Sequence, residues 1–287
     1  MTHTTRLDKL IAPGEPAVRV MSSYHTSVSR HDHDFFELVY VREGFCLHDA
    51  ANSITLLMEG DIFILKPGIA HKYIGNRVTQ IFNCVFKPEA VGEMIAELRT
   101  LPGLDRLFDP DPALNPPRLH LSLGERKTFL KLITSMCDEC HDHPLGWTVR
   151  VKSLLASLLV ECARAYRTHM GSDSESSAYS SYVSQALSCI DAHYAQSELT
   201  VQSIAASVGV TGDYLSRQFK QVTGIAVQEY LRRYRFARSM ELLQSDLPVG
   251  EVARLVGFSS LCHFSREFKK ELGITPSQYR AQIIGAE

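Results

Sequence analysis

Two parts of the chain differ in the spacing of their hydrophobic residues. Residues 20–90 contain short runs of β-branched and aromatic residues, at 35–41, 62–65 and 79–86, separated by glycine and proline turns. Such runs are typical of strands in a barrel or sandwich. From Tyr182 onward, apolar residues at three- and four-residue spacing predict helices that end near glycines. The pattern therefore predicts an α+β protein with a β-rich N-terminal part and an all-α C-terminal part.

Between these parts, the sequence predicts two helices, over 123–141 and 146–168. The second carries one apolar stripe, formed by Val151, Leu154, Leu155, Leu158, Leu159, Cys162 and Ala165. This stripe either packs inside one molecule or pairs with a second copy. Residues 170–181 are small and polar and predict a linker. The expected organisation is a β-barrel over 1–122, a helical dimerisation or packing segment over 123–169, the linker over 170–181, and a helical domain over 182–287.

The C-terminal part contains an internal repeat. Residues 200–230 align with 248–279, so that Gly209 matches Gly257 and Phe219 matches Phe268. In each copy a helix ends at the glycine and a second helix follows after a short turn, which is the pattern of a helix-turn-helix unit. A plain helical bundle or a solenoid of helix pairs is the alternative. The presence of only two copies, and the polar outward face of each second helix, favour the helix-turn-helix interpretation.

The end of the second copy, VARLVGFSSLCHFSREFKKELGITPSQYR over 252–280, resembles the signature of the AraC/XylS family of transcription regulators. The resemblance covers about 100 residues. It implies a sequence-specific regulator, an activator, that binds double-stranded DNA, works with RNA polymerase and forms a homodimer. It also implies that a long helix, here 227–243, joins the two units and that each second helix enters a major groove. Leu261 and Cys262 depart from the polar residues that are commoner at such recognition positions.

The residues expected at DNA lie on the outward sides of the two second helices and on the joining helix. Arg217 and Arg266 occupy equivalent positions and are expected to bind guanine edges, with a surface salt bridge as the alternative. Basic residues such as Lys220 and Lys270 are expected to contact phosphates. The full set is Asp213, Ser216, Arg217, Lys220, Gln221, Arg232, Arg233, Leu261, Cys262, Ser265, Arg266, Lys269 and Lys270.

The β-rich part contains a second candidate site, made of His31, His33, Glu37 and His71. Even spacing places the first three on one face of a strand. Three imidazoles and a carboxylate suit a divalent metal such as Zn, Ni, Fe or Mn, although DNA binding requires no cofactor. The alternative is a polar lining for an effector pocket.

The spacing HxHxxxExxxxxxG and the later PG..H resemble the two cupin motifs, over about 60 residues. The resemblance implies a cupin-like barrel that senses a small-molecule effector, with a sugar as the expected class. A metal-dependent cupin enzyme, a dioxygenase or a sugar isomerase, would use the same four residues. The fused DNA-binding half argues against this alternative.

Composition adds little to this picture. The chain has 287 residues and a net charge of −2, so overall charge does not indicate nucleic acid, although the segment from Arg217 to Arg238 is strongly basic. We find no signal-peptide pattern and no apolar run of membrane-spanning length, so a cytoplasmic protein without a membrane segment is expected. Seven scattered cysteines are expected to be reduced thiols, and Cys137 and Cys140 to be packing residues rather than haem attachments.

Overall fold

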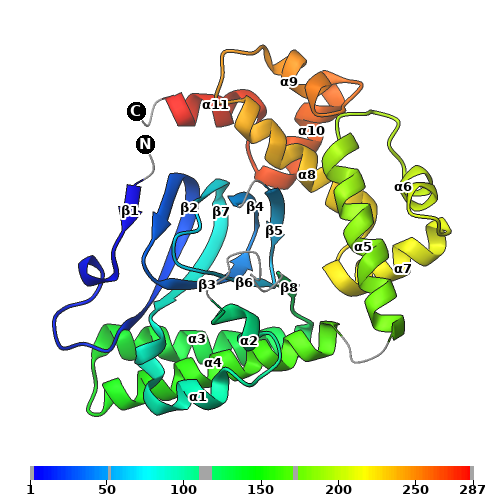
Figure 1. The fold of residues 1–287 in the computed structure, drawn as a ribbon. Helices are drawn as coiled ribbons and strands as arrows, with labels where there is room; N and C mark the ends of the chain where they lie inside the picture. Colours follow the sequence, from blue (N-terminus) through cyan, green and yellow to red (C-terminus); the bar gives the residue numbers. More distant parts are fainter. Residues whose placement is uncertain (1–2, 51–52, 110–117, 171–173, 285–287) are drawn as a thin grey trace.

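The computed structural model describes residues 3–50, 53–109, 118–170 and 174–284 (Figure 1). The N-terminal part is a mostly antiparallel eight-stranded sheet. Its strands are β1 (His3–Thr5), β2 (Val18–His33), β3 (Phe36–Glu43), β4 (Phe45–Ala50), β5 (Ser53–Met58), β6 (Asp61–Leu65), β7 (His71–Phe86) and β8 (Leu119–His120). The three runs singled out in the sequence fall in β3, β6 and the end of β7.

Strand β7 pairs with different strands at its two ends, and this pairing joins the two halves of the sheet. The main order of the strands is β1-β2-β7-β3-β6-β8, while β4 pairs with both β5 and the beginning of β7. One end of β7 therefore pairs with β4 and the other end with β3. Alternate residues then face two sides: Val39 and Val41 point into an inner apolar cluster, and Leu38 and Tyr40 point toward the helices.

Two long helices cover the outer face of the sheet (Figure 1). Helix α3 (Leu123–Asp142) begins with a capping box, in which Ser122 and Glu125 satisfy each other's backbone N–H groups. Helix α4 (Trp147–Met170) follows, and both helices lie close to their expected positions. Short helical turns precede them, at η1 (Leu7–Lys9), η2 (Pro88–Met94), α1 (Ile95–Leu98) and α2 (Leu104–Leu107).

The apolar stripe of α4 lies inside the molecule. All seven of its residues are at most 6% exposed, and they pack with Phe129, Ile133 and Met136 of α3 and with the sheet. Because a single chain already covers the stripe, it cannot also serve as a dimer interface. Of the two alternatives left open for the stripe, packing within one molecule fits the structure, and dimerisation of the chain stays a prediction.

The expected linker over 170–181 is largely helical. Helix α5 (Ser174–His193) covers most of it, while 171–173 lie outside the described residues. The helix contains no glycine or proline, and Val183, Ala186 and Ile190 are buried at helical spacing. Packing of this apolar face supports a helix that reaches back into the serine-rich segment, because serine disfavours helices only weakly.

The remaining helices form the C-terminal domain. They are α6 (Val201–Ser207), α7 (Gly212–Thr223), α8 (Val227–Leu242), α9 (Val249–Leu255), α10 (Leu261–Leu272) and α11 (Pro276–Ile284). Within the described part of the chain, no helix combines the length and apolar character needed to cross a membrane.

We expect Leu158→Ala in the α4 stripe to lower the free energy of unfolding by about 2–5 kcal/mol, because it leaves a cavity in a fully buried layer. Urea denaturation measures the change. Ser157→Ala, on the exposed side of the same helix, is the control and should change stability by less than about 0.5 kcal/mol. A loss that grew as the protein was diluted would instead place Leu158 at an interface between chains.

Candidate nucleic-acid interface and metal centre

The two helix-turn-helix units are built in the same way. Helices α7 and α10 both have twelve residues, and each begins at a hydroxyl cap, since Thr211 and Ser260 accept from the backbone N–H of the third helical residue. Both end at a glycine with positive φ, Gly224 at 78° and Gly273 at 76°. The repeat seen in the sequence is therefore a repeat of local geometry.

Each of these helices has one buried and one exposed face. Leu215 and Phe219 of α7, and Phe264 and Phe268 of α10, are fully buried. The opposite faces carry most of the residues predicted to contact DNA. Asp213, Arg217, Lys220, Gln221, Leu261, Cys262, Arg266, Lys269 and Lys270 are exposed, and Ser216 and Ser265 are half-buried.

The two equivalent arginines lie on these exposed faces. The side chain of Arg266 is 73% exposed, and its nearest carboxylate is that of Glu267 at 3.7 Å. An exposed pair at this distance contributes little and leaves the guanidinium able to turn toward a base. The salt-bridge alternative is therefore weak for Arg266.

Arg233 does not lie on this surface. Its Nε donates to Glu271 at 2.9 Å, a second nitrogen lies 2.9 Å from Glu229, and its guanidinium stacks over Phe45 of the sheet at 5.7 Å. Its prediction as a phosphate contact does not fit this arrangement, since the side chain links α8 to α10 and to the barrel. Arg232 is less engaged, 3.6 Å from Glu271 and about 40% exposed. Sequence spacing identifies the exposed side of a helix but not a carboxylate that arrives from another one.

The β-rich part brings three of the four predicted site residues together. His33 at the end of β2, Glu37 in β3 and His71 at the start of β7 are buried, with one possible ligand atom each within 4.8 Å of the others. The Nε2 atoms of His33 and His71 lie 3.2 and 3.4 Å from the same oxygen of Glu37. His31 lies outside this group. Its ring is half-buried with its centroid 4.3 Å from that of His71.

Backbone contacts fix how the imidazoles face the carboxylate. Nδ1 of His33 is 2.7 Å from the carbonyl of Phe35, and Nδ1 of His71 is 3.1 Å from that of Ile69. A carbonyl can only accept, so each Nδ1 carries a proton and each ring turns its Nε2 toward Glu37, which meets either a lone pair or a second N–H there. Lone pairs and a carboxylate repel unless a proton or a cation lies between them.

The charge state of Glu37 follows from these neighbours. Burial by itself raises the pKa of Glu37, but the hydrogen bonds and positive charge of His33 and His71 outweigh burial and hold the pKa well below its ordinary value. The carboxylate is therefore ionised, and it requires positive charge beside it. Protonated imidazoles or a bound cation can supply that charge.

A further histidine, His48 in β4, was not predicted. It is buried beside His71, with ring centroids 5.5 Å apart, and its Nε2 has no hydrogen-bond partner among the described residues. Burial lowers the pKa of His48 to about 3, so its ring is neutral. The available signal was strand alternation, which places His48 on the same face as the buried Cys46.

Comparisons with known proteins cover both halves of the chain. The sequence model of the protein family 'AraC-like ligand binding domain' matches residues 15–159, and that of the family 'Helix-turn-helix domain' matches residues 196–282. The HTH-type transcriptional activator RhaR of Escherichia coli (strain K12) is 26% identical over 284 residues, which are 98% of each chain. The corresponding RhaR of Shigella boydii serotype 4 shows the same identity and coverage.

Among solved structures, the C-terminal domain of AraT, a response regulator from Geobacillus stearothermophilus, is 39% identical with a TM-score of 0.35. It covers 35% of this chain and 84% of that one. The apo structure of a ToxT variant from Vibrio cholerae is 13% identical with a TM-score of 0.39 and covers 92% of this chain and 97% of that one.

We expect Arg266→Ala to weaken binding to the preferred DNA site by about 1–3 kcal/mol and to relax the preference at one base position, because a bidentate guanine contact is lost. A gel-shift series with each base pair of the site varied in turn measures both effects. Unchanged base preference would remove Arg266 from the recognition residues.

Lys270→Ala should act differently, since a phosphate contact carries no sequence information. Binding to all DNA sequences should weaken to a similar extent, and the slope of log K against log salt should fall by about one. Titrations at several salt concentrations test this. A loss confined to the preferred site would contradict the phosphate assignment.

Proposed function

The chain belongs to the AraC family of DNA-binding transcription activators with a ligand-binding domain, and from this premise we propose how its two halves divide the work. It is a regulator and not an enzyme, so the histidine cluster is not assigned to catalysis. The C-terminal domain recognises DNA through the exposed faces of α7 and α10. The single observation that carries this proposal is that both helices begin at a hydroxyl cap, bury two large apolar residues four positions apart and carry an exposed arginine at the same position.

The residues proposed to contact DNA are the predicted ones without Arg233. Arg217 and Arg266 would contact bases, while Lys220, Lys269, Lys270 and Arg232 would contact phosphates. Support comes from their position opposite the buried face of each helix.

We further propose that the N-terminal domain binds a small-molecule effector of the sugar class. The protein would act as a cytoplasmic homodimer that contacts RNA polymerase. A dimer whose two chains bind adjacent half-sites would bind DNA more tightly than one chain, because binding of the first chain raises the effective concentration of the second. Because the α4 stripe is buried, we place the dimer contact at the turn between α3 and α4, where Leu145 and Val149 are exposed.

The N-terminal domain also has a site whose residues fit a divalent metal. Ligand atoms about 2.1 Å from a tetrahedral Zn²⁺ lie about 3.4 Å from one another, close to the spacing between Glu37 and the two imidazoles. The backbone carbonyls already orient both rings with their Nε2 atoms inward, as metal-binding histidines require. His33, Glu37 and His71 would hold the ion, and His31 or an effector atom would complete its coordination. The ion would supply the positive charge that the buried carboxylate needs.

Selection of DNA from a random pool by the purified full chain tests the proposed DNA recognition. We expect enriched sequences with two conserved elements about one helical turn apart, one for each recognition helix. Adding candidate sugars should change the affinity of the protein for the enriched sequences. Recovery of the pool without enrichment would contradict sequence-specific binding.

Glu37→Gln should lower the affinity for Zn²⁺ by at least about tenfold, because it removes the ionised ligand. Isothermal titration calorimetry of the metal-stripped full chain measures it. Glu43→Gln, an exposed glutamate of the same strand, is the matched control and should bind Zn²⁺ as the parent protein does. Equal affinity in the two variants would leave the histidines as an effector-pocket lining.

A further inference from the structure

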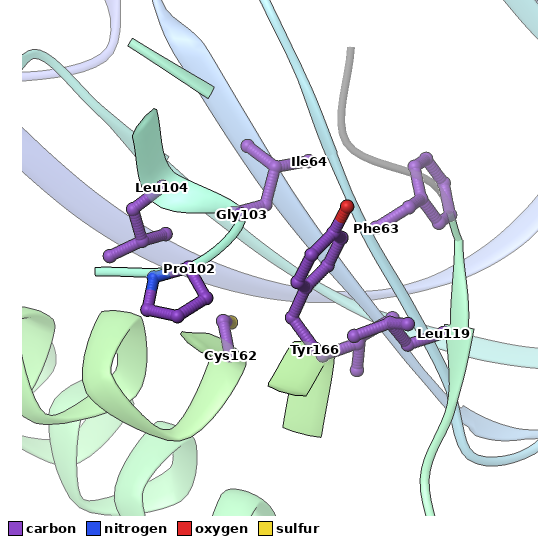
Figure 2. Close-up of a pocket in the computed structure, with 9 residues that line it drawn as sticks. Phe63, Ile64, Pro102, Gly103, Leu104, Leu119, Cys162 and Tyr166 are labelled. Atoms are coloured by element: carbon purple, nitrogen blue, oxygen red, sulfur yellow. The ribbon is translucent and has the colours of Figure 1, made fainter. Parts of the chain in front are cut away.

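A small apolar cavity lies between the sheet and helices α2 and α4, outside the inner cluster of the barrel. It has a volume of about 30 Å³, is partly open to solvent and shares no residue with the histidine site. Figure 2 shows its walls, which come from β6, the turn before α2, β8 and α4. They are formed by Ile62, Phe63, Ile64, Pro102, Gly103, Leu104, Leu119, Cys162 and Tyr166.

The chemistry of these walls excludes charged ligands. Every lining side chain is apolar except Cys162 and Tyr166. Burial raises the pKa of Cys162 to about 12, so its thiol stays neutral. Apolar walls favour apolar atoms, such as xenon or a hydrocarbon group, over water.

One wall of the cavity is a half-buried aromatic ring. The ring of Tyr166 packs directly against Gly103, whose φ is +80° and where a Cβ would lie 2.6 Å from the ring. The ring therefore occupies space that only glycine leaves open. Tyr166 is half-buried, so a change of rotamer would enlarge the cavity without unfolding α4.

Strand β8 connects the cavity to the DNA-binding domain. Leu119 lines the cavity, and its two neighbours, Arg118 and His120, contact the other side, as strand alternation requires. Both neighbours are held by the buried carboxylate of Asp61, at 3.1 Å from Arg118 and 2.8 Å from His120.

On that other side, the two residues touch the first helix-turn-helix unit. The guanidinium of Arg118 interacts electrostatically with the hydroxyl group of Tyr230 in α8. The imidazole of His120 lies against Gly224, the C-cap of recognition helix α7, where a Cβ would overlap it. A shift of Leu119 therefore displaces two contacts with the domain that binds DNA.

We propose that this cavity is a second ligand site, which takes a short uncharged apolar group of a small molecule, and that β8 transmits its occupancy to recognition helix α7. The regulatory part of this inference rests on the proposed DNA-binding function. A ligand that enlarged the cavity would move Leu119 and loosen the contacts of Arg118 and His120, which we call the β8 contact. Occupancy would then change the affinity for DNA.

Binding is tested with xenon on the full chain carrying ¹³C-labelled isoleucine and leucine methyl groups. We expect saturable shifts at Ile62, Ile64, Leu104 and Leu119, and none at Ile133, which is buried in the same helical layer away from the cavity. Cys162→Phe or Ile64→Phe should fill the cavity and abolish the shifts. Either variant suffices if the other fails to fold. Absence of shifts in the parent protein, or equal shifts at Ile133, would overturn the site.

Transmission is tested by the affinity for a DNA site selected from a random pool. Cys162→Phe should change the Kd at least about threefold. In an Arg118→Met/His120→Ala background, where both side chains of the β8 contact are removed, the same substitution should change the Kd less than about 1.5-fold. Met136→Phe, a buried substitution of the same layer outside the cavity, should leave the Kd unchanged in both backgrounds. Equal effects of Cys162→Phe in the two backgrounds would overturn transmission through β8. Failure of the proposed function would look different, since no variant or parent protein would prefer any DNA.

Discussion

The burial of helix α8 is the constraint on which the arrangement of this protein depends. Its buried residues point in several directions and include Tyr230, Tyr234, Phe236 and Met240. They form one continuous apolar cluster with both helix-turn-helix units and with Phe45, Leu47, Leu56, Met58 and Ile74 of the sheet. A helix with buried residues on more than one side must be covered on more than one side. The same helix that spaces the two recognition helices therefore also attaches the sensor domain to them.

The sheet contains two buried carboxylates, Asp61 and Glu37, whose neighbours differ in kind. Asp61 accepts from Arg118, His120 and the backbone N–H of Met58, so every neighbour donates to it. Glu37 instead faces the Nε2 atoms of two imidazoles, which can present either a proton or a lone pair to it. A buried carboxylate with fixed donors is structural, whereas one paired with two imidazoles can exchange their protons for a cation. Asp61 therefore belongs to the contact between the domains, whereas Glu37 belongs to the site that can bind a cation or a ligand.

The sequence reveals the features that depend on local periodicity. Repeated glycines and matched aromatic residues predict both helix-turn-helix units. Even spacing predicts one strand for His31, His33 and Glu37, but the chain turns after His33, so Glu37 reaches the site from β3 rather than β2. The same reasoning does not identify the partners of a side chain that come from another domain. Arg233 has the spacing of an exposed basic residue, yet Glu271 and Phe45 occupy it. The serine-rich segment before Tyr182 has the composition of a linker, yet packing of Val183 and Ile190 supports a helix through most of it. The sequence predicts no role for Arg118 and His120, because their role depends on Tyr230 and Gly224, which lie far along the chain in the other domain.

These contacts decide how a signal can pass between the domains. A ligand shifts an equilibrium only by its difference in affinity for two arrangements of the protein. If the connection were flexible, a ligand in the sensor domain would not change the arrangement of the recognition helices. Here the sheet touches α8 and the cap of α7 through an apolar cluster, a cation–π contact and the pair of Lys72 with Glu241 at 3.6 Å. Weakening one exposed ion pair would change little. Displacing a strand that carries Arg118 and His120 would remove two buried contacts together. Communication through β8 therefore requires only a small movement, because closely packed contacts tolerate displacement poorly.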